Sequence, residues 1–89
     1  MKIESDTIER ARFGGLALER LIAAIWPEAY RVALSILRDR GMAEDVAQEA
    51  CAAIARSLPA LKDLGAFHAW SYKIVVNHAL AAVRRRRHT

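Results

Sequence analysis

The chain has 89 residues, of which 54% are hydrophobic and 27% charged, with only four glycines and two prolines. That length allows one small domain, and the apolar share is enough for a core, which argues against intrinsic disorder. The formal net charge is +4, so an anionic partner is more plausible than a cationic one.

Several segments exclude particular classes of protein. Residues 1–13 alternate acids and bases and contain no apolar stretch, so they do not read as a signal peptide. The longest apolar run, residues 66–83, contains Lys73, Asn77 and two histidines, which predicts no membrane span. The single cysteine, Cys51, cannot form an internal disulfide and suits a reducing compartment. We therefore expect a cytoplasmic protein that makes no membrane contact.

Charge is distributed unevenly along the chain. Residues 1–63 carry nine Lys or Arg and ten Asp or Glu, whereas residues 64–89 carry five basic residues and no acid. A cationic segment of this kind favours a polyanion such as nucleic acid or an anionic membrane. A solvated basic chain end is the alternative.

The first half of the chain predicts two helices. Residues 16–25 have apolar side chains at helical spacing, and Trp26-Pro27 indicates a break because the residue before proline avoids the α conformation. A second helix is predicted from Pro27 to about Arg38. The pair Gly14-Gly15 separates residues 1–15, which we expect to be a partly ordered extension, from a helical domain over residues 16–89.

The second half predicts two more helices. One runs over about residues 42–58 after a turn at 39–41, and its predicted inner face is Val46, Ala47, Ala50, Ile54 and Leu58. A loop at 57–65 contains Pro59, and the last helix runs from about residue 66 into the arginines. Its predicted core face is Phe67, Trp70, Ile74, His78 and Ala81. The expected fold class is all-α, a compact bundle of about four helices.

Three acids lie in the first half of the third predicted helix. Glu44 and Asp45 fall near its start, where the helix dipole favours negative charge. Glu49 lies too far along, and with Asp45 it forms a like-charged i,i+4 pair that is mildly destabilising. A helix that keeps such a pair is consistent with the presentation of acids to a basic partner.

The last predicted helix carries a mixed face opposite its core face. This face combines apolar and cationic side chains: Tyr72, Lys73, Val76, Leu80, Val83, Arg84 and Arg87. An aromatic residue among cations suits single-stranded DNA, because bases stack on the ring and phosphates pair with the cations. It suits a protein groove equally well, and a neighbouring segment such as residues 1–15 could instead cover it.

Motifs for catalysis are not found. His68 and His78 are too far apart to be an i,i+4 ligand pair, and the sequence has no CxxC, HExxH, GxSxG or glycine-rich phosphate loop. Cys51 is expected to be a small buried residue. We expect no enzyme, no metal site and no cofactor.

Two motifs together resemble region 2 of the sigma-70 family, specifically the extracytoplasmic-function (ECF) group. They are the run AEDVAQE at residues 43–49, and a run F-x-x-W-x-x-x-I-x-x-N from Phe67 to Asn77 that leads into four arginines. The resemblance implies a sigma region 2-like helical domain with two partners. It covers residues 26–87 and includes no counterpart of the helix-turn-helix region 4.

The first implied partner is RNA polymerase. In the family, the acidic helix docks on the coiled coil of the β′ subunit, which implies contacts from Glu44, Asp45, Gln48 and Glu49, with Arg38 or Arg40 nearby. The family usually has a capping acid where this chain has Met42, so Gly41 or Asp39 must cap the helix instead.

The second implied partner is the promoter −10 element. Members of the family melt this DNA duplex and capture a base of its non-template strand. The residues implied are the loop 59–66 and the last helix, with Tyr72, Lys73, Asn77, Arg84, Arg85 and Arg87. The loop is poorer in polar groups than is usual in the family.

An alternative function is a sigma-like interaction module that binds an anti-sigma factor and has little affinity for DNA. A basic helix lying on a membrane surface is less favoured, because its aromatic stripe is needed for the core. In either sigma-like function, we expect the acidic residues and the arginine-bearing helix to lie apart on the molecule.

Overall fold

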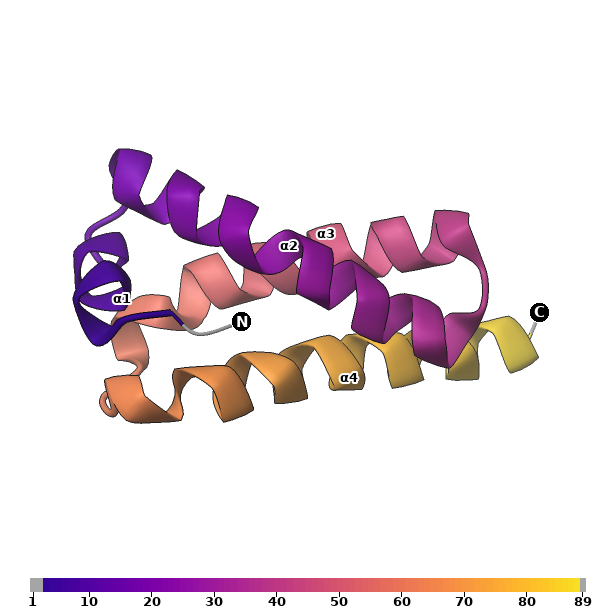
Figure 1. Cartoon of the computed structure of the whole chain (residues 1–89). Helices are drawn as coiled ribbons and strands as arrows, with labels where there is room; N and C mark the ends of the chain where they lie inside the picture. Colours follow the sequence, from indigo (N-terminus) through magenta and orange to yellow (C-terminus); the bar gives the residue numbers. More distant parts are fainter. Residues whose placement is uncertain (1–2, 89) are drawn as a thin grey trace.

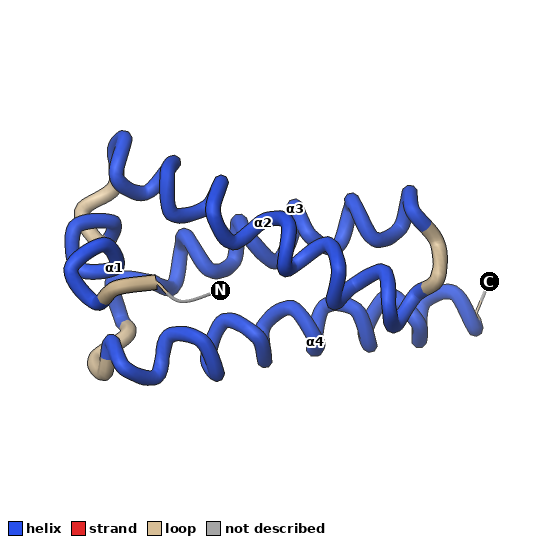
Figure 2. Tube along the Cα trace, viewed as in Figure 1, coloured by secondary structure: helices blue, strands red, loops and turns tan. Residues whose placement is uncertain are grey.

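The computed structural model describes residues 3–88, and within them all regular structure is helical (Figure 2). The elements are α1 (Ser5–Ala11), α2 (Gly15–Leu37), α3 (Arg40–Ser57), the 3₁₀ segments η1 (Leu58–Ala60) and η2 (Leu64–Ala66), and α4 (Phe67–Arg87). The predicted all-α bundle of about four helices is confirmed.

Helices α2, α3 and α4 lie lengthwise beside one another and each contacts the other two, while the short α1 covers one end (Figure 1). The body measures 42 × 21 × 20 Å. Because the chain reverses after α2 and again after α3, the last turn of α4 lies at the same end as the α2–α3 turn. This topology decides which charged residues become neighbours.

The N-terminal segment, expected to be a partly ordered extension, forms α1 and packs on the bundle. Ile8 and Ala11 are buried in the same cluster as the core residues of α2, α3 and α4. The predicted interruption at the glycine pair is confirmed: Gly14 and Gly15 have φ values of 81° and 65°, in the region that glycine adopts without steric cost.

The predicted break at Trp26-Pro27 is wrong, because α2 continues through it. Its buried residues recur every four positions on both sides of the proline: Leu21, Ile25, Ala29, Ala33 and Leu37. Pro27 itself is exposed, and the rings of Trp26 and Tyr30 stack at 5.3 Å across it. Continuous packing of the inner face therefore outweighs the hydrogen bond that proline cannot make.

Helix α3 begins two residues earlier than predicted, and its cap is Asp39. The Asp39 carboxylate accepts a hydrogen bond from the Met42 backbone N–H at 2.9 Å, which settles the choice between Asp39 and Gly41. The predicted inner face is confirmed, since all five of its residues are buried, together with Ala43 and Cys51.

The predicted core face of α4 is confirmed at Phe67 but is wrong by one residue along the rest of the helix. The buried residues of this helix are Phe67, Val75, Ala79 and Ala82. Trp70 and Ile74 are half-buried and pack beside them, while His78 places Nδ1 2.8 Å from the Ile74 carbonyl oxygen. The prediction failed because apolar residues occur on several sides of α4, so its periodicity does not single out one face.

Candidate nucleic-acid and protein interfaces

The four acidic-row residues, Glu44, Asp45, Gln48 and Glu49, are all exposed on the side of α3 that faces away from the core. The first turn of α3 contains no acid, because the helix begins at Arg40 rather than at Met42. The helix dipole acts mainly within the first turn, so it accounts for these acids less well than the sequence suggested.

None of the three acids of the acidic row forms a salt bridge in the described part of the chain. The salt bridges recorded within residues 3–88 join Arg10 to Asp6 and Arg12 to Glu9, both at the opposite end of the bundle. The like-charged pair Asp45 and Glu49 is therefore left uncompensated, a mild cost to the isolated helix. The row is available to a basic partner.

The exposed face of α4 has an aromatic part and a cationic part. Tyr72 is 56% exposed and Leu80 43% exposed, and the polar residues along the same face are exposed as well: Lys73, Asn77, Arg84 and Arg87. The exposure of Asn77 excludes a core role for its amide. We call these six residues the α4 face.

Arg85, also expected to bind DNA, projects elsewhere. It follows Ile74, His78 and Ala81 at helical spacing, and these three residues are only partly exposed. Arg85 is itself exposed but lies on this neighbouring flank of α4. The structure therefore groups five of the six expected DNA-binding residues on one face.

Arg86, which the sequence did not single out, holds the end of α4 against the α2–α3 turn. Its Nη1 donates to the Leu37 carbonyl oxygen at 3.0 Å and lies 3.7 Å from the Met42 sulfur. The carbonyls at the end of a helix have no intrahelical partner, so this bond satisfies one of them. One of the four arginines thus has a structural role that its position in a charge run conceals.

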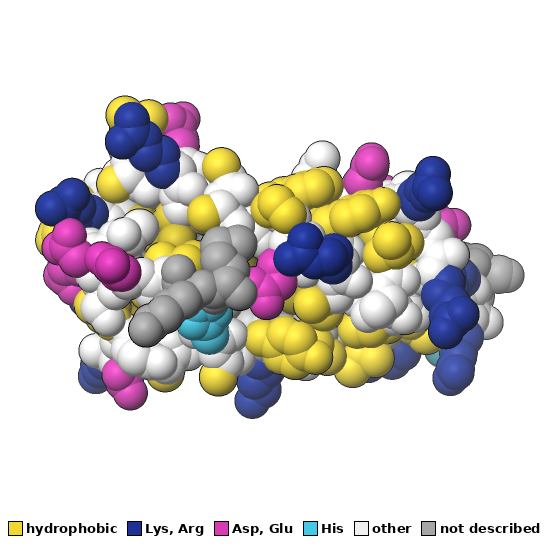
Figure 3. All heavy atoms as spheres, in the orientation of Figure 1, with side chains coloured by type: hydrophobic (Ala, Val, Ile, Leu, Met, Phe, Trp, Pro, Cys, Tyr) yellow, Lys and Arg dark blue, Asp and Glu magenta, His cyan; other side chains and the backbone are white. Residues whose placement is uncertain are grey.

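The acids and the arginines were expected to lie apart, but along the long axis of the molecule they lie at the same end. Arg86 reaches Leu37 and Met42, so the last turn of α4 lies beside the start of α3, where the acidic row begins. Figure 3 shows basic and acidic side chains at this same end. The two sets nevertheless lie on different helices: α3 and α4 pack on each other, and each set occupies the exposed side of its own helix.

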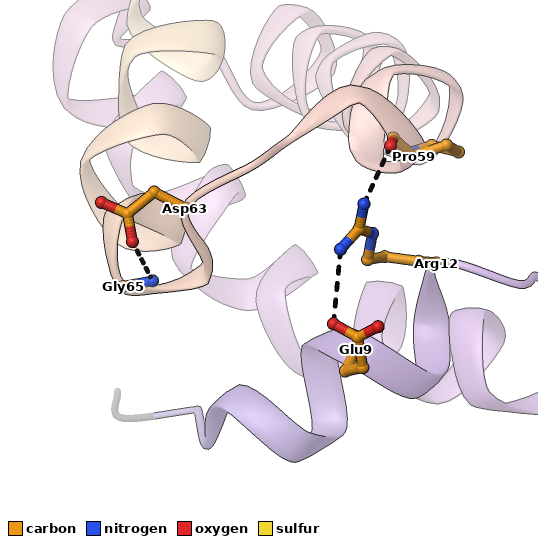
Figure 4. Close-up of polar contacts among 5 residues, drawn as sticks. All are labelled: Glu9, Arg12, Pro59, Asp63 and Gly65. Carbon is orange, nitrogen blue, oxygen red and sulfur yellow. Dashed lines mark hydrogen bonds and ion pairs between the residues drawn. The ribbon is translucent and has the colours of Figure 1, made fainter.

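The connection between α3 and α4 is held by specific bonds (Figure 4). The Asp63 carboxylate accepts from the Gly65 N–H at 3.0 Å, and the Ala66 N–H donates to the Asp63 carbonyl oxygen at 3.0 Å. Arg12 donates through Nη2 to the Pro59 carbonyl oxygen at 3.1 Å and through Nη1 to Glu9 at 3.3 Å. The loop therefore has a defined shape without any bound partner.

Among the described residues, a wide and open apolar groove of about 500 Å³ lies between α2 and α3 and is lined by Leu18, Ile22 and Ala55 among others. A groove of about 30 Å³ between α2 and α4, lined by Ile25, Val32 and Tyr72 among others, has room for one or two waters. No group of three or more potential metal ligands occurs within residues 3–88. Burial raises the pKa of the Cys51 thiol to about 11, so at neutral pH it is protonated and a poor nucleophile.

The described helices include none that is long and apolar enough to cross a membrane. Searches of curated proteins and of solved structures gave no match. The family model for sigma-70 region 2 matches residues 21–89, which include all of α3 and α4 and most of α2. Region 2 is a domain of transcription initiation factors, not an enzyme, and it acts in RNA polymerase binding and promoter recognition. Since this match covers most of the chain, including the acidic row and the α4 face, the chain belongs to the sigma-70 region 2 family.

Proposed function

We propose that the chain is an ECF-type sigma region 2 that docks on the β′ coiled coil through the acidic row and binds melted −10 DNA through the α4 face. The observation that carries the proposal is that both sets of residues are exposed on helices whose inner sides are buried in the core. A function on RNA polymerase would place the chain in the cytoplasm.

The acidic row supports the polymerase contact by its charge and its position. Glu44, Asp45 and Glu49 present carboxylates that can pair with Lys or Arg on a facing helix, and Gln48 lies between them as a neutral hydrogen-bonding group. Such a pairing removes the repulsion between Asp45 and Glu49. The repulsion in the free protein thus becomes a gain on binding.

The α4 face supports DNA binding by combining stacking and charge. The Tyr72 ring can stack on an unpaired base, Lys73 and the arginines can pair with phosphates, and Asn77 can bond a base edge or a phosphate. Extruding a base costs a few kcal/mol, which stacking and phosphate contacts together can offset. Arg85, on the neighbouring flank, contributes long-range attraction to the strand.

Polymerase docking is tested with a purified β′ coiled-coil fragment. Glu44→Gln and Asp45→Asn remove a charge while keeping the shape of the side chain, and each is expected to weaken binding roughly tenfold. Glu19→Gln, at an exposed position of α2, is the matched control and should bind like the unmodified chain. Equal affinities for all four proteins would refute the docking surface.

DNA binding is tested by fluorescence anisotropy with single-stranded DNA at several salt concentrations. At most about five phosphate contacts are available, so log K against log salt should slope no more steeply than about −3.5. Lys73→Gln and Arg84→Gln should weaken binding, whereas Arg31→Gln on the exposed side of α2 should not. Binding without salt dependence, or an equal loss from all three variants, would contradict the proposal.

A second candidate, an anti-sigma-binding module with little DNA affinity, is favoured by exposed apolar residues. Leu80 lies among the cations of the α4 face, and Phe13 is 85% exposed. Replacing Arg84, Arg85 and Arg87 by Gln, with Arg86 retained for stability, separates the two functions. If the chain binds promoter DNA, this change should abolish DNA binding. If it is an anti-sigma-binding module, the change should leave binding to the anti-sigma protein largely intact.

A further inference from the structure

The N-terminal helix α1 packs on the loop 59–66, the segment that the resemblance to sigma region 2 implicates in base capture. Ile8 and Ala11 of α1 are each only 1% exposed and belong to the same buried cluster as Leu58 and Leu61, which flank the start of the loop. Contacts also join α1 to η2, at the end of the loop. Helix α1 therefore contacts the end of the loop and shares a buried cluster with the residues near its start, although α1 lies outside the matched residues 21–89.

The polar link between α1 and the loop is Arg12. Its guanidinium donates to the Pro59 carbonyl oxygen at 3.1 Å and to the Glu9 carboxylate at 3.3 Å, as Figure 4 shows. The Arg12 side chain is only 26% exposed. Because the ion pair with Glu9 fixes one side of the planar guanidinium, the other side is aimed at the loop without further loss of side-chain freedom.

The Pro59 carbonyl lies where the loop leaves α3. The neighbouring Leu58 carbonyl accepts from the Leu61 N–H at 3.0 Å, which closes η1. At the other end, Asp63 closes the turn before α4 through its bond to Gly65. The two closed turns make the loop stiff, so its direction relative to α4 depends strongly on how its first residue is held.

We infer that Arg12 is a positioning residue, which holds the loop 59–66 in the orientation that captures an unstacked base beside the α4 face. The inference rests on the proposed function for its DNA partner, but the contact between Arg12 and the loop, which we call the Arg12 latch, is a property of the free protein. Base capture then depends on a helix of the chain that touches no nucleic acid.

The test compares Arg12→Gln with Arg10→Gln. Arg10 lies in the last turn of α1, which Arg12 follows. It pairs with Asp6 at 3.1 Å, has a side chain 73% exposed and makes no recorded contact with the loop. Both variants lose one positive charge, so any general electrostatic effect on DNA affinity cancels between them. Glu9→Gln, which keeps Arg12 but releases its guanidinium, is a milder second variant in case Arg12→Gln folds poorly.

The first measurement is amide hydrogen exchange in the free protein. Exchange at Leu61 and Ala66 should be roughly three- to tenfold faster in Arg12→Gln than in Arg10→Gln, since their bonds close the two ends of the loop. The Met42 amide, bonded to Asp39 at the far end of the bundle, should be unchanged. Equal exchange rates at Leu61 and Ala66 in the two variants would refute the idea that the Arg12 latch holds the loop.

The second measurement uses a single-stranded oligonucleotide enriched from a random pool by the unmodified chain, and copies with one abasic site at each position. Capture of one base predicts a single position at which the abasic copy binds about tenfold more weakly. Arg12→Gln should lose most of this penalty, and Arg10→Gln should keep it. Faster exchange with the full penalty retained would refute positioning, whereas no penalty in the unmodified chain would refute base capture itself.

Discussion

Replacing Arg86 with glutamine should destabilise the fold, whereas the same change at Arg84 should have a smaller effect. Arg86 donates to the carbonyl oxygen of Leu37 at 3.0 Å, and Leu37 is the last residue of α2. Glutamine is uncharged and too short to span the same distance. The Arg84 side chain is exposed and makes no recorded bond.

The magnitude follows from the position of this bond. A hydrogen bond of this type contributes about 1 kcal/mol net when water can reach the freed carbonyl, and somewhat more when it cannot. Each variant also loses one cation from the last turn of α4, worth about 0.3–1 kcal/mol, and this loss is shared by both. The difference between them should therefore be about 1 kcal/mol, or about 4–8 °C in Tm for a domain of this size.

The assay is thermal and urea unfolding followed by far-ultraviolet circular dichroism, with the two variants at equal concentration and ionic strength. Because they have the same net charge, surface repulsion does not separate them. Equal midpoints would show that the Arg86 bond contributes nothing to stability. A larger loss in Arg84→Gln would mean that the last turn of α4 is held by a different arginine.

Three further predictions test the local structure. Gly14→Ala should cost about 1–2 kcal/mol of stability, because the backbone there has φ = +81°, although no neighbouring atom would meet the added Cβ. Gly41→Ala, within α3, should instead stabilise the fold by up to about 1 kcal/mol. The two variants should therefore shift the midpoint of urea unfolding in opposite directions. Asp39→Ala should cost about 1 kcal/mol by removing the acceptor of the Met42 N–H, and Asp39→Ser should restore most of it in the same assay. Burial raises the pKa of Cys51 from 9.0 to about 11, so the folded state holds this proton more tightly and stability should fall between about pH 9 and pH 11, by about 2–3 kcal/mol. Cys51→Ala should lack that part of the fall; parallel pH profiles of unfolding free energy would contradict the assignment.

The features that sequence predicted well depend on local patterns. Helix α3 alternates small apolar and polar residues at clear helical spacing, so its buried face and the exposure of Glu44, Asp45 and Glu49 followed from periodicity alone. The break at Gly14-Gly15 followed from the conformations that glycine tolerates. These signals lie within a few residues of the structure they determine.

The features that sequence missed depend on distant contacts. Pro27 carries a strong local signal for a break, yet packing against α3 and α4 keeps α2 continuous. Apolar residues such as Val76 and Leu80 obscured the buried face of α4, which was decided by what α2 and α3 cover. Local propensity was outweighed in both cases by burial of the inner face.

Sequence by itself determined that the chain is helical, that its basic charge is concentrated near residue 89, and that an acidic row faces solvent. Only the tertiary structure decided that Arg12 holds the loop and Arg86 the α2–α3 turn, because these bonds join residues 47 and 49 positions apart. It also decided that acids and arginines share one end of the bundle, since two reversals of the chain bring the start of α3 beside the end of α4. No periodicity within one helix contains that information, because it depends on how whole helices pack.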